Sequence, residues 1–94
     1  MADEIDVQLT AHAAEQIVLR ELDRELVIAT ARSPEQIVRS ESKPPVAQSR
    51  ISFKGRPALL RVAFRDEDRT RWIITAYPTS QIERYWLEEP DDEA

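Results

Sequence analysis

The stretch that decides the fold is residues 49–77, which read SRISFKGRPALLRVAFRDEDRTRWIITAY. Runs rich in β-branched and aromatic residues alternate here with turn-forming or charged residues, as is typical of consecutive strands. The runs predict strands over 49–53, 58–64 and 71–77. The first link, residues 54–57, contains the only glycine of the chain, which permits the positive φ of a tight turn. Because both links are short, we expect the strands to be antiparallel neighbours.

Alternation along these strands assigns their side chains to two faces of a sheet. One face is expected to be apolar and to lie under helices, with Leu60, Val62, Phe64, Trp72, Ile74 and Ala76. The opposite face is expected to carry cations, hydroxyl groups and a phenol among smaller residues, from Arg50, Ser52, Lys54, Leu59, Arg61, Ala63, Arg65, Arg71, Ile73, Thr75 and Tyr77. This second face is the candidate for function.

The flanking sequence predicts helices and two shorter strands. Thr10 is a suitable N-cap for a helix over 11–22, and Asp23 for a helix over 24–32 that Pro34 brings to an end. After the third strand, Ser80 and Glu83 have the spacing of a capping box, which predicts a helix over 81–87. Residues 6–9 and 37–41 are predicted to form short strands.

Length and composition indicate one domain. The 94 residues are 41% hydrophobic and 33% charged, which is ordinary for a globular protein. We assign residues 5–87 to an α+β domain, with two N-terminal helices packed on one face of a three- to four-stranded antiparallel sheet and a short C-terminal helix, and residues 88–94 to an acidic disordered tail. The chain has no cysteine, which excludes disulfides and thiolate metal sites. We find no signal peptide or membrane-spanning run, and expect a cytoplasmic location.

The net charge of −5 conceals a basic middle of the chain. From Arg39 to Arg71 there are nine lysines and arginines against four acidic residues, whereas seven acidic residues lie near the two ends. Such asymmetry is compatible with a polyanionic partner. It is equally compatible with a solvated sheet between acidic chain ends, and charge alone does not decide between the two.

Two groups of residues are candidates for chemistry. His12 is the only histidine and could move protons near neutral pH, although a lone helical histidine is more often a surface or capping residue. The polar-face group suits an RNA phosphodiester, because cations stabilise phosphorane charge and a tyrosine can stack on an unpaired base; it comprises Lys54, Arg61, Arg71, Thr75 and Tyr77. The alternative is that these residues merely keep an exposed sheet polar. One histidine and scattered carboxylates do not make a metal site, and we expect no cofactor.

Four short motifs in order resemble a known family. They are TAHA at residues 10–13, SPEQI at 33–37, LLRV at 59–62 and TAYPTSQIERYW at 75–86. Together they resemble a small bacterial family, described as a domain of unknown function, with a histidine-alanine helix and a TxYxTSKIxKYW ending. That family is grouped with toxins of the RelE/ParE and BrnT kind. The resemblance extends from Val7 to Trp86.

The resemblance implies a toxin-like α+β fold and metal-independent cleavage of mRNA or tRNA, with an antitoxin protein and RNA as partners. The motif residues that the resemblance implies are His12, Arg20, Arg61, Thr75, Tyr77 and Ser80. Together with Lys54 and Arg71 of the polar-face group, they give the expected site. We expect His12, Arg61, Thr75 and Tyr77 to be catalytic, and Arg20, Lys54, Arg71 and Ser80 to bind phosphate. Gln81 and Arg84 stand where the motif has lysines. The alternative function is a non-catalytic protein- or RNA-binding module that retains the fold. Whether the protein is a monomer or a homodimer stays open.

Overall fold

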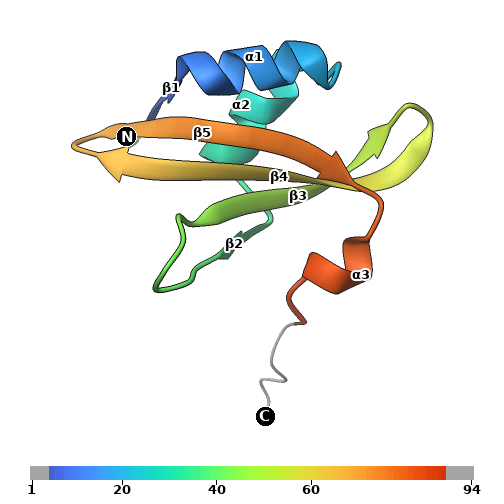
Figure 1. Ribbon diagram of the computed structural model, residues 1–94. Coiled ribbons are helices and arrows are strands. Elements are labelled where there is room, and N and C mark those ends of the chain that lie inside the picture. The colour runs from blue at the N-terminus through green and yellow to red at the C-terminus, as the bar shows by residue number, and fades with distance from the viewer. Residues whose placement is uncertain (1–4, 89–94) are drawn as a thin grey trace.

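A five-stranded sheet with two helices on one face forms the body of the protein (Figure 1). The computed structural model describes residues 5–88. The elements in chain order are β1 (Asp6–Leu9), α1 (Ala11–Leu19), α2 (Arg24–Arg32), β2 (Gln36–Val38), β3 (Val46–Phe53), β4 (Arg56–Glu67), β5 (Thr70–Thr79) and α3 (Ile82–Tyr85). The strand order is β1-β5-β4-β3-β2. Of the tail predicted to be disordered over residues 88–94, residues 89–94 are outside the described residues.

The α+β class is confirmed, but the predicted three- to four-stranded antiparallel sheet is wrong. The sheet has five strands and is mixed, because β1 pairs with β5 in parallel while the other pairs are antiparallel. Thr10 fixes the junction between β1 and α1. Its hydroxyl donates to the Ile73 carbonyl at 2.9 Å and accepts from the Ala13 N–H at 3.1 Å, so one side chain caps the helix and ties it to β5.

The helices begin where their caps predict. Asp23 caps α2 by accepting from the Glu25 N–H at 3.0 Å, and α2 covers the predicted residues. The first helix ends three residues earlier than predicted. Glu21 adopts a left-handed conformation with φ 57°, its N–H donates to the Val18 carbonyl, and the Leu22 N–H donates to the Ile17 carbonyl. This is a Schellman motif, which terminates α1 at Leu19.

The core lies between the two helices and the sheet. Its fully or nearly fully buried members are Ala13, Ile17, Val27, Ala31, Ala47, Leu60, Val62, Phe64, Ile73 and Ala76. Small residues on the helices allow them to approach the sheet closely, while Leu60 and Phe64 from β4 fill the space between. The central strand therefore supplies the largest apolar side chains beneath the helices.

A β-bulge changes which residues of β5 face the helices. Ala63 pairs with Thr75, but Phe64 pairs with Ile73, so Ile74 has no partner. One extra residue reverses the alternation beyond that point. Ile73 therefore lies in the core beside Phe64, which corrects its predicted place on the polar face. Two more predictions are wrong for the same reason: Arg71 lies on the helix side, and Trp72 lies on the opposite face.

The remaining elements differ from the prediction in extent. Gln81, not Ser80, is the N-cap of α3, and within residues 5–88 no side chain caps this helix; the predicted capping box is therefore not formed. The strand predicted over 37–41 shares only residues 37 and 38 with β2, and the helix predicted over 81–87 is shorter. The charged link between β4 and β5 shrinks to a tight turn because both strands extend into it. Within residues 5–88, none of the helices has the length and apolar character needed to cross a bilayer.

Candidate functional site

Arg61 is at the centre of the face opposite the helices. It is paired with Gln48 of β3 on one side and with Tyr77 of β5 on the other. Its Nε donates to the Gln48 side-chain oxygen at 3.0 Å, and its Nη1 donates to the Tyr77 hydroxyl oxygen. Three adjacent strands thus bring together a guanidinium, an amide and a phenol, and two of these residues are among the predicted site residues.

The segment after β5 crosses this face. We call residues 80–87, which include α3, the C-terminal strap; Figure 1 shows α3 on the side of the sheet away from α1 and α2. The ring centroid of Tyr85 lies 4.2 Å from the Arg61 guanidinium carbon, and that of Tyr77 lies 5.7 Å from it. Arg61 is therefore bordered by two aromatic rings, in an arrangement that favours cation–π attraction.

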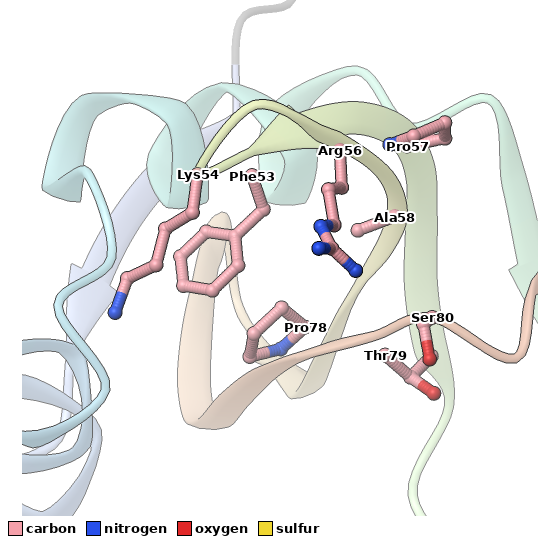
Figure 2. Close-up of a pocket in the computed structure, with 8 residues that line it drawn as sticks. All are labelled: Phe53, Lys54, Arg56, Pro57, Ala58, Pro78, Thr79 and Ser80. Carbon is pink, nitrogen blue, oxygen red and sulfur yellow. The ribbon is translucent and has the colours of Figure 1, made fainter.

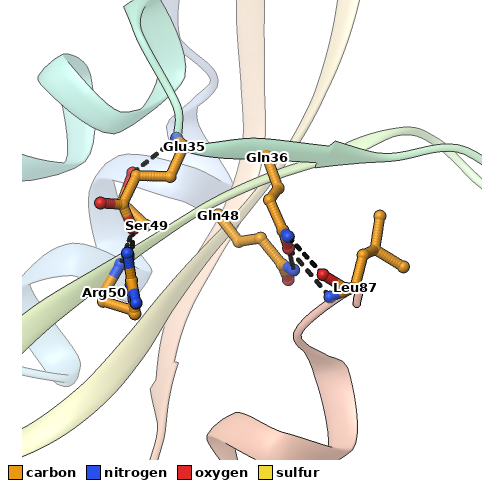
Figure 3. A network of polar contacts seen from close by, with 6 residues as sticks. All are labelled: Glu35, Gln36, Gln48, Ser49, Arg50 and Leu87. Carbon is orange, nitrogen blue, oxygen red and sulfur yellow. Dashed lines mark hydrogen bonds and ion pairs between the residues drawn. The ribbon is translucent and has the colours of Figure 1, made fainter. Parts of the chain in front are cut away.

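A buried glutamine anchors the strap. Gln48 has no exposed surface, and its Nε2 donates to the Gln36 side-chain oxygen at 2.7 Å and to the Tyr85 carbonyl at 3.0 Å. Gln36 in turn holds the backbone of Leu87 through two hydrogen bonds of 2.7 and 3.0 Å (Figure 3). Both donors and the acceptor of the buried amide are used, which avoids the penalty of an unpaired polar group.

A second arginine, Arg50 of β3, stacks on an aromatic ring near the β2 edge of the sheet. The Arg50 guanidinium carbon is 4.4 Å from the Trp86 ring centroid, and the Arg50 Nε is 3.1 Å from a Glu35 carboxylate oxygen. The same oxygen accepts the Arg50 backbone N–H at 3.0 Å (Figure 3). This backbone hydrogen bond, followed by the side-chain hydrogen bond from Arg50, lowers the pKa of Glu35. Glu35 therefore stays ionised beside the arginine.

Thr75 lies on the same face of the sheet as Arg61 and Tyr77. It pairs with Ala63 on the same face as Arg61 and Tyr77, one row further along the strands. The structure therefore groups three predicted catalytic residues, Arg61, Thr75 and Tyr77. Ser80 begins the strap at the end of β5.

The other predicted site residues lie elsewhere. His12 is exposed on α1, on the opposite side of the sheet. Arg20 follows α1 and donates to the Ala76 carbonyl at 2.7 Å, which fixes the end of α1 on β5. Lys54 is in the turn between β3 and β4 and pairs with Glu21. These three residues do not form one constellation with Arg61.

Arg71 has a structural environment on the helix side. It makes a bidentate contact with Asp66 at 2.8 and 2.9 Å and donates to the Ala31 carbonyl at 2.9 Å. Its guanidinium carbon is 4.0 Å from the Phe64 ring centroid. The hydrogen bond from Arg71 is the main cause that lowers the pKa of Asp66. Arg71 thus closes the edge of the core rather than facing the candidate site.

The site contains residues that the strand prediction omitted. Gln48, Tyr85 and Trp86 hold or stack on its arginines, and Gln36 holds Gln48 and the backbone of Leu87. Gln48 was missed because β3 begins three residues before the predicted strand. The available signal was the pair Val46-Ala47 directly before Gln48, which extends the predicted strand towards its N-terminus. Chemically, the face offers guanidinium groups, aromatic rings and the phenols of Tyr77 and Tyr85. In the described part of the chain, no three histidine or acidic side chains are grouped so as to hold a metal ion.

Comparisons with protein-family models, with curated proteins and with solved structures give no match for this chain. The family resemblance carried by the four motifs therefore stays a prediction.

Proposed function

We propose that this protein binds single-stranded RNA on the sheet face around Arg61. The observation that carries the proposal is the repeated approach of arginine to aromatic rings across this face. Arg50 stacks on Trp86 and Arg61 on Tyr85, with guanidinium carbons 4.4 and 4.2 Å from the ring centroids. The Arg84 guanidinium carbon lies 5.4 Å from the Tyr85 ring centroid, and that of Arg61 lies 5.7 Å from the Tyr77 ring centroid. Guanidinium groups bind phosphates and aromatic rings stack on unpaired bases, so their alternation suits a single strand.

Exposure of the cations supports this assignment. Arg50 and Arg84 are exposed, whereas Arg61 is partly covered by the strap. A strand would therefore meet the outer arginines first, and the central arginine would support the rings from beneath. Because the proposed contacts join guanidinium groups to phosphates, affinity should fall as the salt concentration rises.

The test is fluorescence anisotropy of a labelled single-stranded oligouridine titrated with the full chain. Arg84→Gln removes an exposed guanidinium and should weaken binding by about threefold, the order expected for one exposed charge. Arg69→Gln, in the turn between β4 and β5, is the matched control and should bind as the wild type. Absence of saturable binding at low salt, or equal loss in both variants, would refute the proposal.

A metal-independent endoribonuclease toxin is the second candidate, favoured by the hydrogen bond between Arg61 and the Tyr77 hydroxyl. In such cleavage the RNA's own 2′-hydroxyl attacks phosphorus, the 5′-oxygen leaves, and a cyclic phosphate remains. Arg61 would stabilise the phosphorane charge, and Tyr77 would move a proton. An antitoxin protein would cover this face and keep the toxin inactive in the cytoplasm.

Growth after induced expression in a bacterial host separates the two candidates. Arrest by wild type that Tyr77→Phe relieves and His12→Ala does not, at equal protein level, would favour cleavage at the Arg61 face. Relief by His12→Ala would instead place the chemistry on α1. Normal growth with intact RNA, despite binding to oligouridine, would leave the non-catalytic module as the function.

A further inference from the structure

A hollow lies at the end of the hairpin between β3 and β4, and it shares only Ser80 with the strap that crosses the Arg61 face. It has a volume of about 390 Å³ and is lined by Phe53, Lys54, Arg56, Pro57, Ala58, Pro78, Thr79 and Ser80 (Figure 2). Strand register places Phe53 beside Arg56, and Pro78 beside the core residue Leu60. The floor of the hollow is therefore on the helix side of the sheet, beyond the part that the helices cover.

The early end of α1 leaves this part of the sheet uncovered. The Schellman motif at Glu21 stops the helix, and Glu21 then pairs with Lys54 at the tip of the hairpin. Both residues have positive φ, 57° and 53°, a conformation that costs free energy in residues other than glycine. The ion pair joins the helix end to the hairpin at the margin of the hollow.

The walls of the hollow select an apolar group. Phe53, Pro57, Ala58 and Pro78 provide the apolar surface, and prolines have no N–H with which to hydrogen-bond a ligand. Hydroxyl groups are present only at Thr79 and Ser80. A nucleobase placed on the floor would leave much of its polar edge without partners, which is unfavourable. A single aliphatic or aromatic side chain meets no such penalty.

The margin of the hollow is positively charged, which favours a ligand with a negative charge next to its apolar group. Arg56 is exposed, and in Figure 2 its side chain extends over the hollow between Phe53 and Ala58. Lys54 lies on the other side of Phe53, with its ammonium 5.3 Å from the ring centroid. Because the Lys54 ammonium is already paired with Glu21, a carboxylate adjoining the buried group would bind Arg56, as in charge-assisted contacts at the rim of protein interfaces.

We propose that this hollow binds an acidic peptide segment of a partner protein, which inserts one large apolar side chain. The apolar floor supplies most of the affinity, and the exposed guanidinium of Arg56 supplies the preference for acidic neighbours. This interaction goes beyond RNA binding, because it uses a different face and a different class of partner.

The test titrates the full chain into a labelled short peptide with a central leucine flanked by glutamates. We expect saturable binding that weakens by about tenfold when the leucine is replaced by serine, since one buried leucine carries most of the contact. Arg56→Gln should weaken binding by about threefold, and Arg69→Gln should not change it. Amide NMR shifts of the wild type should be largest at Ala58 and Ser80.

Other outcomes would overturn the proposal. These are absence of saturable binding, shifts centred on Arg61, displacement of the peptide by uridine monophosphate, or a concentration-dependent dimer that Arg56→Gln abolishes. The last outcome would assign the hollow to a second copy of this chain. Arg84→Gln distinguishes the two proposals, because it should weaken oligouridine binding and leave peptide binding unchanged.

Discussion

The two faces of the sheet are covered in different ways. On the helix side, α1 and α2 bury a continuous apolar core that includes Phe64 and Ile73. On the other side, the C-terminal strap has no buried residue in its helix and is held by hydrogen bonds and stacked arginines. Strands β4 and β5 therefore carry an apolar interface on one face and a polar interface on the other. Because apolar burial dominates stability, the helix side should hold the fold together while the strap opens locally.

The largest expected effect is loss of the helix-side core. Phe64→Ala removes a ring that is 1% exposed and should lower the free energy of unfolding by about 3–5 kcal/mol, the usual range for such cavities. Urea denaturation measures this change. Arg65→Ala, at the adjacent exposed position, is the control. A loss similar to that of the control would mean that the helices do not pack as described.

The second effect concerns the strap side. Gln48→Ala leaves partners of a buried amide unsatisfied and should cost about 1–3 kcal/mol. Hydrogen exchange should show loss of protection at the Leu87 amide, which Gln36 holds, while core amides stay protected. Exposed Gln8→Ala is the matched control. Protection of Leu87 that survives Gln48→Ala would show that the amide network does not anchor the strap.

The third effect is acid sensitivity at the edge of the helix side. The hydrogen bond from Arg71 lowers the pKa of Asp66 in the folded protein, so its contribution is present above the unfolded pKa of about 3.9 and is lost as pH falls through the folded pKa. Since 43% of the Asp66 side chain is exposed, we expect less than about 1 kcal/mol. Comparing wild type with Asp66→Asn in urea at pH 6 and at pH 3 tests this. An equal loss on acidification in both proteins would contradict it.

The smallest effect is expected at the ion pair between Glu21 and Lys54. Both side chains are well exposed, and the hydrogen bond and charge of Lys54 lower the pKa of Glu21. A double-mutant cycle with Glu21→Gln and Lys54→Met should give weak coupling at low salt that disappears at high salt. The urea midpoints of the four proteins measure it. Coupling that persists at high salt would indicate more than a screened surface pair.

Much of the fold could be predicted because its signals are local. Thr10 and Asp23 mark the starts of the helices, and the Lys54-Gly55 turn joins β3 to β4 with both residues at positive φ. The bulge at Ile74 could not be predicted in the same way, since an extra residue in a strand depends on how both partners pack. That single residue placed Arg71, Trp72 and Ile73 on the faces opposite to those predicted.

The site was predictable only in the part of the sheet between the bulge and the hairpin that joins β3 to β4. Alternation correctly grouped Arg61, Thr75 and Tyr77 on one face because their registers are uninterrupted. The contacts of Tyr85 and Trp86 with the arginines depend on how the chain turns after β5, for which no short-range pattern exists. His12 was included by residue type, and type alone does not place a helix residue on a given side of the sheet.

The carboxylate of Glu35 has a consequence for self-association. β2 pairs with only the first three residues of β3. Without another partner, the next backbone donor, the Arg50 N–H, could donate a hydrogen bond to a strand of another molecule. The Glu35 oxygen occupies that donor, and the lowered pKa of Glu35 keeps the oxygen charged to a more acidic pH than an ordinary glutamate. An ionised side chain thus takes the place that an incoming strand would need. It discourages intermolecular pairing along the part of β3 that β2 does not cover.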